Sequence, residues 1–279
     1  MIKFHCDRHH SSDNTPIVTD IALQEYAEAV MADYKPKLLK EPGKVNGLHF
    51  LESYLGANLD YQDIYYKEDE GQIAGATVFN DEKVLVFDRE AQRIKPIDVP
   101  ANTIILDNLT IQDGKEGFAL FTELHEGGHF CIHPAVYRRF GNQMTLFDFG
   151  MEKNPGNHIV KCCRSTIEGK CERKSRLETQ HDFREHQANI FAAAMAMPRP
   201  TFIPYAQELI RQCGNKDGIW VEPSEMDWDY VFGLEAIIEE LASVFGVSKS
   251  AARVQMKRQG ILFSENEYLQ QRSQLAVAF

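Results

Sequence analysis

Two histidines four residues apart, His125 and His129, flank Glu126 in the sequence His-Glu-Gly-Gly-His. On a helix, positions i and i+4 lie on one face, so both imidazoles can reach one metal ion at about 2.1 Å. Glu126 is rotated away from this line of ligands, so its carboxylate can take a proton from a water at the metal. Zinc lowers the pKa of such a water from about 16 to roughly 7, so the pattern predicts hydrolysis at neutral pH.

A catalytic zinc usually has three protein ligands, so a third is expected elsewhere in the chain. Glu185 is the best candidate, because it and Asn189 are i, i+4 partners on a later apolar helix and both can face the first helix. Asn189 can then hydrogen-bond the far nitrogen of a ligand histidine. His186 and His133 are alternative third ligands, but three histidines in one helical row converge poorly, and His133 is expected behind the ligands or in the core.

Chance and packing are the alternatives to a metal site. With ten histidines in the chain, a spurious match to this pattern has a probability of roughly a few per cent. Gly127 and Gly128 cost a helix about 1–2 kcal/mol relative to alanines, which indicates tight packing or close approach of a substrate at this point. Nothing in the sequence identifies the group that stabilises the oxyanion opposite the metal; Tyr137 is a candidate.

Hydrophobic spacing predicts the elements that carry these residues. Runs of β-branched and aromatic residues separated by turns predict a small, mostly antiparallel sheet, with strands over residues 61–67, 73–79, 83–87 and 103–109. Helices are expected over residues 20–33, 48–54, 118–132, 182–197, 233–245 and 249–258. The predicted fold class is α+β: the sheet packs on a two-helix zinc-binding core, and a small helical unit follows at the C-terminus.

Composition changes along the chain predict its division. We expect a flexible N-terminal arm over residues 1–18, a zinc-binding domain over residues 19–215, and a helical unit over residues 216–279. A long basic excursion interrupts the middle domain at residues 141–177, and such a loop is either mobile or functional. Its cysteines, and Cys6 near the N-terminus, match no paired zinc spacing, so we expect free thiols at Cys6, Cys162, Cys163 and Cys171.

Charge and hydropathy restrict the location and partners of the protein. The formal net charge of −11 argues against a surface that binds nucleic acid broadly. Basic residues of the last predicted helix, including Lys249 and Arg253, can contact DNA phosphates, although a solvated helix face is the more ordinary explanation. The N-terminus has no apolar signal segment, and the apolar run at 190–197 is too short to span a bilayer. We therefore expect a cytoplasmic protein that does not contact membranes.

The predicted strand at residues 103–106 comes just before the first metal helix. If this strand forms the edge of the sheet beside that helix, it can pair with an extended peptide through main-chain hydrogen bonds. This gives a hypothesis for how a peptide substrate binds.

Several motifs of the chain together resemble the ImmA/IrrE-like metallopeptidase family. They extend over about residues 100–262 and comprise Phe121-Thr122 with the His125–His129 motif and His133, Glu185-x-x-Ala188-Asn189-x-Phe191-Ala192, Met197-Pro198, and Leu241-Ala242-x-x-Phe245-Gly246-Val247-Ser248. The paired metal motifs are specific, and the C-terminal motif is weaker.

This resemblance implies a gluzincin-like zinc peptidase, often encoded beside a helix-turn-helix repressor that it cleaves or regulates. The family's metal histidines correspond to His125 and His129, its general base to Glu126 and its metal glutamate to Glu185. Two features depart from the family: Gly127 replaces a bulky apolar residue, and the basic excursion is longer than usual.

The sequence and the resemblance thus predict an endopeptidase with one zinc ion and a protein or peptide substrate, and such a repressor is a candidate substrate. The alternative is a metal-bound regulatory protein that binds a repressor or DNA with little or no turnover. Hydrolysis of a non-peptide bond by the same centre is a third hypothesis.

Overall fold

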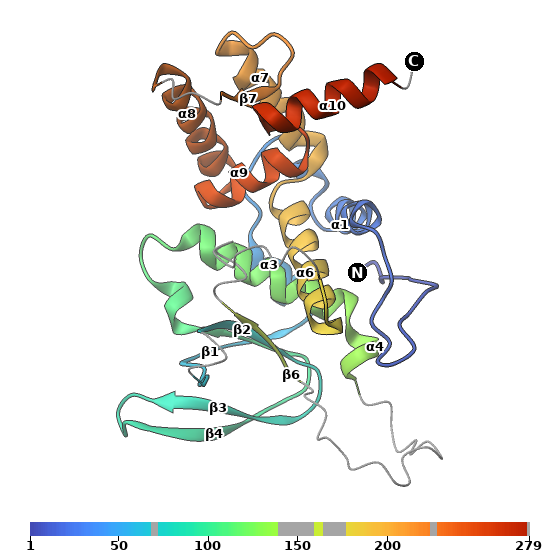
Figure 1. Cartoon of the computed structure of the whole chain (residues 1–279). Coiled ribbons are helices and arrows are strands. Elements are labelled where there is room, and N and C mark those ends of the chain that lie inside the picture. Colours follow the sequence, from blue (N-terminus) through green and yellow to red (C-terminus); the bar gives the residue numbers. More distant parts are fainter. Residues whose placement is uncertain (68–71, 139–158, 164–176, 224–227, 278–279) are drawn as a thin grey trace. The chain divides into compact units, whose positions relative to one another are not determined.

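A computed structural model describes residues 1–67, 72–138, 159–163, 177–223 and 228–277 (Figure 1). The chain forms two compact units, and each combines segments that are distant in the sequence. Unit 1 comprises Met1–Ala27 and Asn46–Ala192, and unit 2 comprises Glu28–Val45 and Ala193–Phe279. Two of the three boundaries fall inside helices, α1 (Asp20–Tyr34) and α6 (Gln180–Ala196). The domain boundaries predicted from the sequence stay a prediction.

Unit 1 contains short strands and helices in addition to its share of α1 and α6. Its further elements are α2 (Gly47–His49), the π-helix η2 (Phe50–Leu55), β1 (Asn58–Gln62), β2 (Ile73–Val78), β3 (Glu82–Asp88), β4 (Arg93–Val99), β5 (Thr103–Asp107), η3 (Asn108–Ile111), α3 (Glu116–Ile132), α4 (Pro134–Tyr137) and β6 (Ile159–Cys163). Gly56, at φ +70°, ends η2, because this left-handed conformation favours glycine. Thr179 and Asp182 cap α6 reciprocally, each side chain accepting from the other's backbone N–H.

The sheets of unit 1 are small and mostly antiparallel. Four strands run in the order β1-β5-β2-β6, with β1 and β5 parallel and the other neighbours antiparallel. The hairpin β3–β4 forms a separate antiparallel pair. In Figure 1, α3 lies on one side of the four-stranded sheet and this hairpin on the other. The expected α+β class is confirmed, although the parallel pairing of β1 with β5 was not predicted.

Strand β2 is buried at every position, so its two faces serve two different layers. Ala76 and Val78 belong to the apolar cluster that also contains Val84 and Val86 of the hairpin. The intervening residues point the other way, towards α3, as the contact between Gly75 and the side chain of Glu126 shows. The sheet therefore supports the helix that carries the two histidines.

Helices α3 and α6 approach each other closely at a glycine. A Cβ atom built on Gly128 would lie 3.2 Å from the Cα of Ala188 and 3.2 Å from the ring of Phe191. Backbone cannot move aside as a flexible side chain can, so only glycine fits here without shifting a helix. Gly127 is tight as well, against the side chains of Leu51 and Phe50. The tight packing expected at the two glycines is confirmed.

Unit 2 is mainly helical. Its elements beyond its share of α1 and α6 are η1 (Pro36–Leu39), α7 (Arg199–Gln212), β7 (Trp220–Glu222), α8 (Trp228–Phe245), α9 (Lys249–Arg258), β8 (Leu262–Ser264) and α10 (Glu265–Val277). Phe202 and Phe245 meet in its core with ring centroids 5.4 Å apart. Ser248 caps α9 by accepting a hydrogen bond from the Ala251 N–H, as expected at a helix start.

Two predictions about the strands need correction. Strand β4 was missed, because its outward-facing residues and Pro96 hide the period-two pattern of a half-buried strand. The strand at 103–106 is β5, which pairs with β1 on one side and β2 on the other. It is an inner strand whose backbone groups are already paired, so the hypothesis that it binds an extended peptide is wrong.

The basic excursion at 141–177 lies largely outside the described residues, as does Cys171. Its described part includes β6, which contains Cys162 and Cys163 and pairs with β2. Cys6, Cys131 and Cys213 are free thiols. No helix in the described part of the chain is long and apolar enough to cross a membrane.

The close approach at Gly128 predicts a specific sensitivity. Gly128→Val should lower the free energy of unfolding by about 2 kcal/mol, because the added methyl groups overpack the contact with Ala188. Urea unfolding followed by circular dichroism measures this change. Ala29→Val, at a half-buried position of α1, should cost under about 1 kcal/mol and controls for helix propensity. Equal losses for the two variants would contradict the packing argument.

Candidate metal centre

Three predicted residues come together between α3 and α6. His125, His129 and Glu185 each offer one donor atom, and these atoms all lie within 4.8 Å of one another. The two histidine Nε2 atoms are 2.9 Å apart. The Glu185 carboxylate oxygens lie 3.4 Å from Nε2 of His125 and 3.2 Å from Nε2 of His129. Both histidines are fully buried and Glu185 is 8% exposed.

These separations fit a single small cation. Two ligands at about 2.1 Å from an ion, at tetrahedral angles, lie about 3.4 Å apart. The observed donor separations, from 2.9 to 3.4 Å, are at or slightly below this value. Two imidazoles and one carboxylate form a donor set that suits a first-row divalent ion such as zinc. The group can therefore hold a metal ion.

The charge of the Glu185 carboxylate is not fully compensated by its neighbours. Among the described residues, neither of its oxygens has a hydrogen-bond partner of good geometry, although both are buried. A buried charge that lacks a full set of partners costs several kcal/mol. Burial raises the pKa of Glu185, but attraction to the two histidines outweighs it, so the pKa lies well below its usual range. A cation between these donors would satisfy the carboxylate.

Hydrogen bonds around His125 fix its tautomer. Nδ1 of His125 lies 2.9 Å from Oδ1 of Asn189, one turn beyond Glu185 on α6. An amide oxygen only accepts, so Nδ1 carries the proton and Nε2 keeps its lone pair available to a metal ion. The sequence suggested this role for Asn189, and the distance agrees with it.

A longer chain of hydrogen bonds fixes the tautomer of His129. Gln187 donates from Nε2 to the Pro16 carbonyl at 2.7 Å, so its Oε1 must accept from Nε2 of His133 at 2.9 Å. Burial lowers the pKa of His133 well below its usual value, so this ring is neutral and its Nδ1 bears no proton. That Nδ1 accepts from Nδ1 of His129 at 3.0 Å, which leaves Nε2 of His129 free.

The unprotonated Nε2 atoms of His125 and His129 therefore lie only 2.9 Å apart. With a proton on each Nδ1, the Nε2 lone pairs of His125 and His129 point at one another and repel, unless a cation or a shared proton lies between them. Burial lowers the pKa of His129 to about 4. Burial also opposes protonation of His125, but hydrogen bonding and attraction to Glu185 raise its pKa. The group thus favours positive charge at its centre.

Glu126 is fully buried on the side of α3 that faces the sheet. Its Oε2 accepts a hydrogen bond of 2.6 Å from the Thr77 hydroxyl of β2. Its Oε1 is buried and has no hydrogen-bond partner among the described residues. Burial raises the pKa of this carboxyl to about 8, against the attraction of His125 and the hydrogen bond from Thr77.

The other candidates lie outside the group of three donors. His186 pairs with Asp20 at 2.8 Å. The ring of Tyr137 stacks on Phe79 with centroids 5.4 Å apart, and Arg184 lies over it at 5.3 Å. Burial raises the pKa of Tyr137 to about 12, so it stays protonated. Its role at an oxyanion stays a prediction.

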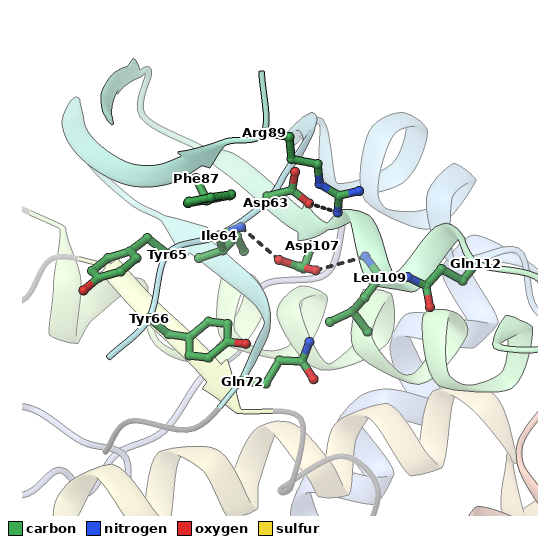
Figure 2. A pocket seen from close by; sticks show the side chains of 10 residues that line it. All are labelled: Asp63, Ile64, Tyr65, Tyr66, Gln72, Phe87, Arg89, Asp107, Leu109 and Gln112. Atoms are coloured by element: carbon green, nitrogen blue, oxygen red, sulfur yellow. Dashed lines mark hydrogen bonds and ion pairs between the residues drawn. The ribbon is translucent and has the colours of Figure 1, made fainter. Parts of the chain in front are cut away.

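Unit 1 also has a pocket of about 410 Å³ at the carboxyl ends of β1 and β5 (Figure 2). Its two acids are engaged. Asp63 pairs with Arg89, and Asp107 accepts hydrogen bonds of 2.9 Å from the N–H groups of Ile64 and Leu109. Asp107 thus ties a strand end to the cap of η3, which explains its burial without a ligand.

A comparison with known protein families gives a match in the second half of the chain. The sequence profile of peptidase M78, described as the IrrE N-terminal-like domain, matches residues 167–257. The predicted resemblance to the ImmA/IrrE-like family is confirmed. The matched stretch includes Glu185 and Asn189, whereas His125 and His129 precede it. No individual curated protein matches the chain. The ImmA/IrrE-like match supports a metallopeptidase-like domain.

The donor geometry predicts one bound divalent ion per chain. Elemental analysis after dialysis against zinc should find about one equivalent in the unmodified protein. Glu185→Gln and His129→Ala should each lose most of it, because each removes a donor from the buried group. His186→Ala is the matched control and should keep the ion, since His186 pairs with Asp20. Full retention by Glu185→Gln would contradict the site.

The hydrogen-bond chain behind His129 predicts a weaker effect at a residue that the sequence did not single out. Gln187→Met keeps the volume but removes both hydrogen bonds, so metal affinity should fall by about 10- to 100-fold. Competition with a chromophoric chelator measures this affinity. Gln255→Met is the control, because Gln255 is an equally buried glutamine of unit 2 that donates to a backbone carbonyl. A similar loss in both variants would argue against the relay.

Proposed function

We propose that this protein is a zinc-dependent endopeptidase that cleaves a peptide bond in a protein substrate. The observation that carries the proposal is the buried group of His125, His129 and Glu185, with the carboxylate of Glu126 next to it in sequence and fully buried. The match to the IrrE N-terminal-like domain supports the same reaction class. A helix-turn-helix repressor, suggested by the family resemblance, is the first substrate to test.

Each residue of the site has a distinct task in this reaction. His125, His129 and Glu185 would hold the ion, and Asn189 and the His133–Gln187 relay keep both histidines in the tautomer that binds it. A divalent ion there supplies Lewis-acid chemistry, acidifying water and polarising the substrate carbonyl. Glu126 takes the proton from the attacking water and delivers it to the amine that leaves.

The electrostatics of Glu126 suit this shuttle. Burial raises the pKa of Glu126 to about 8, close to the operating pH of most enzymes. A general base is most effective when its pKa lies near that pH. Positive charge in the neighbouring donor group favours the ionised carboxylate, because opposite charges nearby lower the pKa of an acid. Glu126 can therefore accept and return a proton without a large energetic cost.

The alternative is a metal-bound regulatory protein that binds a repressor or DNA, and its DNA-binding form has less support. Three of the basic side chains that suggested DNA binding form ion pairs within unit 2. Lys249 pairs with Glu239, Arg253 with Glu222 and Glu235, and Lys257 with Glu222. A phosphate would have to displace these carboxylates, and the net charge of −11 opposes its approach.

Replacing Glu126 separates catalysis from binding. Glu126→Gln should keep the metal ion, since Glu126 is not a donor of the group, while hydrolysis falls by about 10²- to 10⁴-fold. The measurement is cleavage of a proteome-derived peptide library by the zinc-loaded protein, read by mass spectrometry. Glu123→Gln is a control on the same helix, with a buried carboxylate that lies beside Gly47 and is outside the group of three donors.

Two outcomes would reject the proposal. One is undiminished cleavage by Glu126→Gln, and the other is the absence of any cleavage by the zinc-loaded, unmodified protein. If a cellular phenotype survived the Glu126→Gln change, the regulatory alternative would be favoured.

A further inference from the structure

Strand β2 places a hydroxyl group directly against the carboxylate of Glu126. The Oγ1 atom of Thr77 donates to Oε2 of Glu126 at 2.6 Å and lies 3.3 Å from the backbone oxygen of the same residue. Thr77 and Glu126 are both 0% exposed, so water does not compete for this hydrogen bond. The contact joins residues 49 positions apart in the sequence.

Gly75, two residues before Thr77 on the same face of β2, leaves room for the other carboxylate oxygen. A Cβ atom at position 75 would lie 2.7 Å from Oε1 and 2.9 Å from Cγ of Glu126. Gly75 is not among the glycines with positive φ, so its backbone conformation does not itself demand glycine. The requirement for glycine comes from the carboxylate.

The sheet holds these two residues firmly. Gly75 is paired with Leu106 of β5 and Cys162 of β6, and Thr77 with Ile104 and Val160. A shift of one residue in register would turn Thr77 to the opposite face, into the apolar cluster with the hairpin. The hydroxyl is therefore fixed in position before any substrate binds.

We propose that Thr77 is the positioning residue of Glu126 and that Gly75 provides the clearance it needs. The proposal rests on the proposed function. Thr77 holds Oε2, so the carboxylate keeps one rotamer and presents the buried, unpartnered Oε1 to the water. The proton from water goes to Oε1 and then to the leaving amine, while the Thr77 O–H remains on Oε2 throughout.

A pair of conservative substitutions tests this role. Thr77→Val keeps the shape but removes the donor, so kcat should fall by about 10- to 100-fold with KM and bound zinc unchanged. Thr77→Ser keeps the hydroxyl and should restore kcat to within about threefold of the unmodified protein. Gly75→Ala should also lower kcat, because its Cβ displaces the carboxylate.

Thr103→Val is the matched control. Thr103 is a buried threonine of β5 in the same sheet, and its hydroxyl donates to the Pro100 carbonyl at 2.7 Å rather than to Glu126. This variant should keep both kcat and KM. Stability measured by urea unfolding shows whether Thr77→Val and Thr103→Val are equally perturbed.

Infrared difference spectroscopy gives a readout independent of turnover. The carboxyl band of Glu126 is the one that disappears in Glu126→Gln, and it should shift in Thr77→Val but not in Thr103→Val. If Thr77→Val fails to fold, Thr77→Cys supplies a weak donor of similar size and should show the same shift with a smaller loss of kcat.

The outcomes separate this inference from the proposed function. Full kcat and an unshifted band in Thr77→Val, with Glu126→Gln inactive, would overturn the positioning role and leave the peptidase proposal standing. Loss of zinc together with kcat in Thr77→Val would also overturn it, because the threonine would then be structural. Full activity of Glu126→Gln would reject both proposals.

Discussion

The contact between α3 and α6 at Gly128 is the constraint on which the site depends. The backbone of Ala188 lies where a side chain on α3 would otherwise be, so the two helices are close enough for the Glu185 carboxylate to reach both histidines. A larger separation would leave a carboxylate and two rings buried apart from one another, each with an unmet charge or lone pair. The spacing of the two helices sets the distances between the donors, so the tight packing at Gly128 also determines the electrostatic interactions of the site.

Burial also makes a cation between the three donors favourable. Two imidazoles with their lone pairs directed inward and a carboxylate without good hydrogen bonds form an arrangement that is costly by itself. Surrounding residues stabilise it indirectly by fixing protons: Asn189 on one histidine, His133 and Gln187 on the other. Binding of an ion to such a group would also stabilise the folded protein, because the donors do not converge in the unfolded chain.

Local sequence patterns predicted the parts of the site that local structure determines. The i, i+4 spacing of His125 and His129, and the helix carrying Glu185, follow from periodicity, and the structure brings these residues within reach of one another. Contacts across the chain could not be predicted in this way. Thr77 lies 49 residues from Glu126, and Gln187 meets Pro16 over 171 residues, so no window of sequence contains both partners. Strand order has the same limit, which is why β5 was mistaken for an edge strand.

The hydrogen bond from Gln187 to the Pro16 carbonyl links the N-terminal segment, through His133, to His129 of the three-donor group. Thr15 is buried, and Asp13 pairs with Arg184 of α6, so this segment is seated on the helix that carries Glu185. Thermodynamic coupling between two equilibria is reciprocal. An ion bound at the three donors would therefore share a coupling free energy with docking of the first residues, so a change at this end of the chain would also alter the affinity for the ion.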